Sequence, residues 1–272
     1  MSVSTATKKK KNQVTPRQVI KLDAMGAYYK DLNRQIRAMA LEGARKFEIS
    51  NVYGQRYIGT NLWGVEDRDK IRIRVNGTPG SDLGAFMDGP TLEVFGNAQD
   101  ATGNTMNCGR IIVHGSAGDV LGYGMRGGEI YVRGNVGYRV GIHMKEYRNK
   151  IPTIVIGGTM QDFFGEYMAG GRIIVLNKFF EGNPPIRQSY FIGTGMHGGS
   201  IFVRGDVEAH QIGAEVGISE PTDKEWKEIE KYVAKFCSAF GLEKKQVKLL
   251  KREKFWRLSA KSKRPYGTLY AY

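Results

Sequence analysis

The sequence predicts an all-β solenoid, a right-handed parallel β-helix of about seven coils with an α-helix at each flank. A strand pattern, apolar-x-apolar-x-Gly, recurs with its fifth position at residues 77, 96, 115, 134, 158, 177 and 205, so the steps are 19, 19, 19, 24, 19 and 28. A period of 19 residues is too short for a pair of helices and matches one coil of a solenoid. The right hand follows from the strong preference of parallel connections.

A second glycine follows each strand by seven residues, once the longest step is corrected for nine extra residues. Glycine adopts positive φ without a Cβ penalty, so these residues are expected to turn the corners of the coils. A helical alternative is disfavoured, because an interior glycine costs a helix about 1 kcal/mol. The expected corner glycines are Gly77, Gly84, Gly96, Gly103, Gly115, Gly122, Gly134, Gly141, Gly158, Gly165, Gly193 and Gly205.

Within each strand, alternate residues should face opposite sides. Ile111 and Val113 are expected inside the coil, with Ile112 and His114 outside. The two longer steps place extra residues in Met144–Pro152 and in 178–186, which are polar, proline-bearing stretches. Both are expected to form loops that protrude from one coil.

Helices are expected at the flanks. Leu32, Ile36 and Met39 recur at helical spacing within residues 27–42, and Thr222 with Glu225 forms a capping box before a second apolar stripe. These helices could cap the open ends of the solenoid or pack along one side. The predicted division is therefore a basic tail and helix over 1–45, the β-helix over 46–220, and a helix with an extended basic tail over 221–272.

Positive charge is concentrated at the two flanks. Lys and Arg outnumber acids by 10 to 3 over residues 1–45 and by 14 to 6 over 221–272, whereas residues 46–220 hold 17 against 18, which together give the net +14. This pattern fits a solvated face or a docking surface for an acidic partner. Nucleic-acid binding would use the same basicity but calls for an aromatic-lined surface as well.

Two cysteines are too few for an iron–sulfur cluster or a disulfide framework, and no apolar run reaches the roughly 20 residues of a membrane span. No secretory signal is recognised, so a cytoplasmic protein is expected. The segment from Gly122 to Gly127 matches the dinucleotide fingerprint G-x-G-x-x-G, with Glu146 about 20 residues on. The same string recurs at Gly193, so corner geometry explains it better.

The remaining candidates for chemistry are histidines and aspartates. His114, His143, His197 and His210 have no regular metal-ligand spacing. Asp100, Asp119 and Asp162 occupy equivalent corner positions and are reminiscent of the carboxylates of a carbohydrate-active β-helix enzyme, which leaves that function as an alternative. Their recurrence favours a structural role, and no catalytic, cofactor-binding or metal-binding residue is predicted.

Four ordered motifs, at Gly80–Phe86, Gly96–Asp100, Gly165–Gly171 and Gly193–Gly199, resemble the glycine-repeat C-terminal domain of the glutamate synthase large subunit, over about residues 50–215. With the segments 51–60 and 264–270 included, the whole chain resembles the stand-alone version of this domain in split glutamate synthases. The same domain is known from one of the subunits of formylmethanofuran dehydrogenase and from N-methylglutamate synthase, and these two scaffold functions remain alternatives.

The resemblance implies a scaffold that is not an enzyme by itself. In the family, an N-terminal cysteine of an amidotransferase hydrolyses glutamine, whereas this chain has Ser2; a separate synthase part with FMN and an iron–sulfur cluster aminates 2-oxoglutarate. Both partners and both cofactors are thus expected on other subunits of an oxidoreductase complex in glutamate biosynthesis. Residues 142–145 depart from the family pattern. The suggested interface residues are Arg126, Arg133, Arg139 and Arg204.

Overall fold

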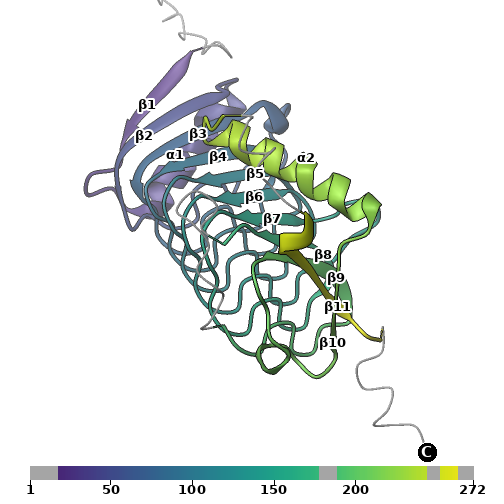
Figure 1. Ribbon diagram of the computed structural model, residues 1–272. Helices are drawn as coiled ribbons and strands as arrows, with labels where there is room; N and C mark the ends of the chain where they lie inside the picture. The colour runs from purple at the N-terminus through teal and green to yellow at the C-terminus, as the bar shows by residue number, and fades with distance from the viewer. Residues whose placement is uncertain (1–17, 178–188, 244–251, 263–272) are drawn as a thin grey trace, which may run out of the picture.

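A computed structural model describes residues 18–177, 189–243 and 252–262. It contains one 11-stranded sheet in the order β1-β2-β3-β4-β5-β6-β7-β8-β9-β11-β10, with two α-helices in the described part of the chain (Figure 1). The expected loop over 178–186 and the tails at 1–17 and 263–272 lie outside the described residues.

The strands are β1 (Val19–Asp23), β2 (Lys46–Tyr53), β3 (Arg72–Thr78), β4 (Asp88–Phe95), β5 (Cys108–Val113), β6 (Glu129–Val132), β7 (Thr153–Ile156), β8 (Ala169–Val175), β9 (Gly198–Arg204), β10 (Val216–Ser219) and β11 (Phe255–Ala260). The helices are α1 (Tyr29–Leu41) and α2 (Asp223–Ala239), and the short 3-10 turns are Arg68–Lys70, Ala209–Gln211 and Arg252–Lys254.

The predicted right-handed parallel β-helix of about seven coils is wrong, because the strands form one mixed sheet rather than the faces of a solenoid. Only the strand part of each 19-residue unit enters the sheet. The rest consists of turns, in which the described residues form isolated bridges, such as Ala98 with Ala117, rather than strands. Backbone hydrogen bonds also join successive turns, as from the N–H of Gly122 to the carbonyl of Thr102 at 2.8 Å. Moreover, β11 runs antiparallel to both β9 and β10, outside the repeat.

The strand register follows the repeat. Equivalent residues pair side by side from β3 to β9, in the order Ile73, Leu92, Ile111, Ile130, Ile154, Ile173 and Ile201. The register holds across both longer steps, since Ile130 pairs with Ile154 and Ile173 with Ile201. The extra residues are therefore accommodated entirely between strands.

The main core lies between the inner face of the sheet and the turn segments, which lie below the strands in Figure 1. Ile111 and Val113 point into it, as expected, and are fully buried. A column of six fully buried methionines faces them from the turns: Met87, Met106, Met125, Met144, Met168 and Met196. Each methionine comes three residues after one of the second-half glycines, which are the glycines that follow a strand by seven residues. This periodic signal is not revealed by the strand pattern alone.

Helix α1 joins β1 to the parallel strand β2 and packs Leu32, Ile36 and Ala40 into the main core. It occupies the expected segment 27–42, shortened at both ends. The apolar residues of this helix thus face the same interior that the turns close elsewhere.

Helix α2 runs across the outer face of the sheet (Figure 1). It begins at the expected capping box, in which Thr222 Oγ1 accepts the N–H of Glu225. Val233 and Phe236 of α2 pack against outward-facing residues of the strands, forming a second core. The members of this core on β5 to β9 are Ile112, Tyr131, Val155, Ile174 and Phe202. The sequence left open whether the helices cap the ends of the repeat or pack along one side, and α2 packs along a side.

Candidate partner interface

The predicted corner glycines fall into two structural kinds. Gly122 has φ +68°, and a Cβ there would lie 2.6 Å from Ile154 Cδ1, so it is needed both for its conformation and for space. Gly134 has no positive φ, but a Cβ would lie 2.4 Å from Ser116 Oγ and 2.9 Å from the carbonyl oxygen of Gly115. Gly134 is thus explained by the close approach of a neighbouring chain segment.

Most of the other corner glycines repeat one of these two arrangements. The second-half set, with φ between +65° and +73°, is Gly84, Gly103, Gly122, Gly141, Gly165 and Gly193. Those at strand ends without positive φ are Gly96, Gly115, Gly134 and Gly158, whereas Gly77 and Gly205 have φ of +123° and +112°.

The four suggested interface arginines lie at different places along the chain. Arg126 precedes β6, whereas Arg133 and Arg139 follow it, and Arg204 ends β9. Arg126 and Arg133 are exposed, but Arg204 is partly buried, and burial lowers the pKa of its guanidinium. The interface built from these four residues remains a prediction.

Arg139 is committed to contacts within the chain. Its Nη1 donates to Glu166 Oε2 at 2.8 Å, and its guanidinium lies 4.9 Å from the centroid of the Phe163 ring. Phe163 in turn stacks on Phe191, with ring centroids 4.9 Å apart. All three residues Arg139, Phe163 and Phe191 have left-handed φ of 55–58°, a conformation that is unusual for bulky side chains. They form an ordered row on the turn segments.

The corner aspartates hold successive turns together. Asp100 Oδ1 accepts the backbone N–H of Asp119 at 2.9 Å, and Asp119 Oδ1 accepts that of Tyr138 at the same distance. Asp162 Oδ1 does likewise with the N–H of Tyr190. The shared pattern favours the structural explanation of these carboxylates, because each satisfies a donor of the next repeat unit.

The histidines occupy unrelated environments. The His114 ring stacks on Phe95 at 4.5 Å, and its Nε2 lies 3.1 Å from Glu93 Oε1. The rings of His143 and Tyr167 stack at 5.3 Å, whereas His197 Nδ1 lies near the carbonyl of Gly195. His210 approaches Glu208 Oε2 at 3.3 Å. Across the residues that the structure describes, no group of three or more His, Cys, Asp or Glu could hold a metal ion.

The two cysteines differ in environment: Cys108 is exposed, and Cys237 is buried on α2, where burial raises the pKa of its thiol. Neither pairs in a disulfide.

A partly buried ionic cluster joins α2 to the sheet. Glu129 on β6 accepts hydrogen bonds from Arg110 Nη2 at 2.9 Å, from the Tyr131 hydroxyl at 3.0 Å, and from Lys235 Nζ on α2. Burial opposes ionisation of Glu129, but the hydrogen bond from Lys235 and the charge of Arg110 hold its pKa below the ordinary value. Burial and the Glu129 charge raise the pKa of Tyr131. Glu129 and Lys235 are 106 residues apart, so no local sequence signal could have joined them.

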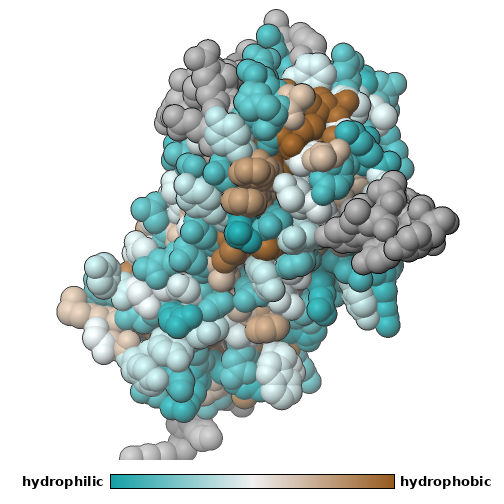
Figure 2. All heavy atoms as spheres, turned by 90° about the horizontal axis from the view of Figure 1, so that it is seen from below, coloured by the Kyte–Doolittle hydropathy of each residue, from teal (hydrophilic) through white to brown (hydrophobic). Residues whose placement is uncertain are grey.

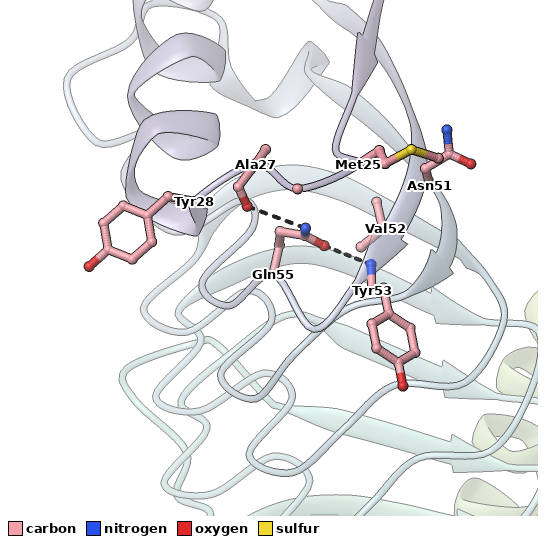
Figure 3. A pocket seen from close by; sticks show the side chains of 8 residues that line it. Met25, Ala27, Tyr28, Asn51, Val52, Tyr53 and Gln55 are labelled. Atoms are coloured by element: carbon pink, nitrogen blue, oxygen red, sulfur yellow. Dashed lines mark hydrogen bonds between the residues drawn. The ribbon is translucent and has the colours of Figure 1, made fainter.

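A shallow pocket lies where β1 leads into α1 and β2 ends (Figure 3). Met25 and Tyr53 on its rim are 74% and 89% exposed. Gln55 at its base is fully engaged, because its Nε2 donates to the carbonyl of Ala24 at 2.8 Å and its Oε1 accepts the N–H of Tyr53 at 2.7 Å. Apart from tyrosines, the residues that line this pocket carry no titratable side chain, so it offers contact surface rather than acid–base chemistry.

The face opposite the sheet carries scattered apolar groups. Figure 2 shows it as a broken band of hydrophobic side chains among hydrophilic ones. Phe86 and Phe191 are 60% and 53% exposed.

Among the described residues, no helix is both long and apolar enough to cross a membrane.

Comparison with known proteins gives two findings. The family described as "GXGXG motif" matches residues 30–261. A protein of Methanocaldococcus jannaschii, described as uncharacterized, is 47% identical over 252 residues, which cover 92% of this chain and 95% of the relative.

Proposed function

The protein belongs to the GXGXG-motif family, and from this membership we propose that it is a non-catalytic scaffold subunit of a glutamate-synthase-like complex. The GXGXG domain is found in glutamate-synthase-type proteins, so the resemblance seen in the sequence motifs is confirmed. In the proposed complex, this chain binds an amidotransferase subunit and an FMN-dependent synthase subunit side by side. The assembled complex transfers the amide nitrogen of glutamine to 2-oxoglutarate.

One observation supports a scaffold over an enzyme in its own right. The three corner aspartates, which a carbohydrate-active enzyme would use, each accept a backbone N–H from the next repeat unit. Stacked turns require the same contact at equivalent positions, which explains why the aspartates recur. Each carboxylate thus holds one turn to the next. A catalytic pair would instead consist of two acids in different environments on either side of a substrate.

A rigid sheet suits this proposed task. The central residues of the strands pair in register from β3 to β9, and α2 packs across five of these strands. A rigid support fixes the relative position of two partner subunits, so that ammonia released at one site reaches the other without escaping to solvent. The scaffold would contribute to rate through positioning rather than through a reacting group.

The proposal is tested by purifying the tagged protein from its native host and identifying the co-purifying chains by mass spectrometry. We expect an amidotransferase and a flavoprotein, and glutamine-dependent glutamate formation that falls when the scaffold is omitted from the reconstituted mixture. Release of ammonia from glutamine by the isolated chain, or stoichiometric FMN binding to it, would refute the proposal. Recovery of molybdenum or tungsten enzyme subunits would point instead to the formylmethanofuran dehydrogenase type.

A further inference from the structure

The turn between β6 and β7 departs from the repeat. The strands on either side pair in full register, yet the connection holds five residues more than the 19-residue unit. The extra length forms a tight turn in which Tyr147 and Lys150 exchange backbone hydrogen bonds, at 3.2 and 3.0 Å. Residues 145–151 are all exposed, and we refer to them as the basic turn.

The basic turn is anchored at both ends. On one side, Glu146 Oε1 accepts the backbone N–H of Gly171 at 3.0 Å. On the other, the side chain of Lys150 lies against Gly127, where a Cβ would come within 3.1 Å of it, and its Nζ reaches toward Asp88 at 3.9 Å. The structure therefore presents the tip of this turn in a defined position.

Cations outnumber acids among the exposed side chains of this region. Lys145 and Arg148 belong to the basic turn, and Arg126 lies one repeat unit before Lys145 at the equivalent position of its own turn. None of these three makes an ion pair with another described residue. Like charges at neighbouring positions repel, so the fold does not gain from placing them together.

Two apolar side chains accompany the cations. Tyr147 and Ile151 are 48% and 36% exposed, and the guanidinium of Arg148 lies 5.3 Å from the centroid of the Tyr147 ring. A mixture of Tyr, Arg and an aliphatic residue at an exposed, anchored position is typical of protein–protein contacts. Single-stranded nucleic acid calls for several open aromatic faces, whereas Tyr147 is the one aromatic residue of the basic turn and Arg148 lies over one face of its ring.

We propose that the basic turn, together with Arg126, is the docking site for an acidic segment of a partner protein. Because that partner is one of the two subunits named above, the inference rests on the proposed function. Charge complementarity would orient the partner during encounter, and Tyr147 with Ile151 would provide the apolar contact once it has docked.

The test uses the full-length triple variant Arg126→Glu/Lys145→Glu/Arg148→Glu. Purified amidotransferase and flavoprotein subunits are titrated onto wild type and variant at low and moderate salt. We expect the Kd for one of the two subunits to rise by roughly 100-fold or more, and the salt dependence of its binding to become weaker, because attractive charges become repulsive. The other subunit should bind as before.

A matched control is the triple variant Lys21→Glu/Lys46→Glu/Lys227→Glu, which changes the net charge equally at exposed positions on β1, β2 and α2. The Kd of this control variant for each of the two subunits should stay within about threefold of the wild-type value. If the two variants weaken binding equally, or if neither does, the docking site is refuted. Circular dichroism melting of all three proteins checks that the exposed substitutions leave the fold intact.

A labelled octaglutamate peptide and a labelled single-stranded DNA separate the docking site from the proposed function. If neither subunit binds wild type, the proposed function fails; the docking site still stands if the peptide binds wild type and the control but not the Arg126→Glu/Lys145→Glu/Arg148→Glu variant. If the peptide does not distinguish the two variants, or if DNA binding is what the variant loses, the inference is overturned.

Discussion

Glu129→Gln is expected to loosen α2 from the sheet. The substitution keeps the shape of the side chain but removes the charge that Arg110 and Lys235 share. Glu129 is 18% exposed, whereas Arg110 and Lys235 are 43% and 37% exposed. Water can therefore partly solvate the two cations once the carboxylate charge is lost. Removing one partner of a buried ion pair lowers the free energy of unfolding more than removing one partner of a surface pair. The exposure of the two cations reduces this loss. We expect the free energy of unfolding to fall by about 1–2 kcal/mol at pH 7.

The loss should depend on pH in a defined direction. The pKa of Glu129 is lowered in the folded protein, chiefly by Lys235 and Arg110 acting against the effect of burial. Its charge therefore stabilises the fold above the unfolded pKa of about 4.3, and this contribution disappears as pH falls through the folded pKa. Wild type and Glu129→Gln should thus differ most at neutral pH and converge in acid.

Urea unfolding followed by tryptophan fluorescence, at pH 7 and at several values below pH 5, measures this difference. Glu230→Gln is the control, because Glu230 is an exposed residue of the same helix and its substitution changes the net charge equally. It should stay within about 0.5 kcal/mol of wild type. A Glu129→Gln variant as stable as the control at pH 7, or a difference that persists undiminished in acid, would refute the reasoning.

Two further predictions concern turns and caps. Gly122→Ala should cost about 2–5 kcal/mol, from left-handed strain plus crowding against Ile154, whereas Gly124→Ala, with φ +57° and its nearest atom at 3.6 Å, should cost only the strain of about 1–2 kcal/mol. Stability is measured by thermal and urea unfolding, and equal losses for the two variants would contradict the role given to packing. Thr222→Ala should destabilise α2 by about 1 kcal/mol by removing its N-cap, measurable as faster hydrogen exchange in the first turn, and unchanged exchange there would count against it.

The strand register could be predicted because it depends on one strong signal. The apolar-x-apolar-x-Gly pattern, repeated at fixed spacing, fixes which side chains face the core, and a slip by one residue would reverse every one of them. For this reason Ile130 aligns with Ile154 despite the five extra residues between them. The family could be predicted on similar grounds, since glycines such as Gly134 stand where neighbouring backbones approach too closely for a Cβ.

The overall architecture could not be predicted in the same way. Regular spacing shows that successive units stack, but it does not show how much of each unit forms strand. In this chain successive turns are joined by backbone hydrogen bonds, such as that from the Gly141 N–H to the Leu121 carbonyl, and by side-chain caps such as Asp119 with Tyr138. These contacts take the place of strand pairing in further sheets. The antiparallel β11 follows the repeat and pairs with β9 through a contact between distant segments.

The outward-facing residues of the sheet contained a signal that the repeat obscured. Lys21, Glu48, Arg74 and Glu93 are aligned on β1 to β4, and the same column continues on β5 as Ile112, followed by apolar residues as far as β9. A solenoid with a solvated outer face would keep its charges throughout. The change from charged to apolar therefore indicates where a second layer begins, and α2 supplies that layer. It also indicates that β1 to β4 are suited to water or to a polar contact, so a partner on the outer face would meet charged strand residues there and α2 over β5 to β9.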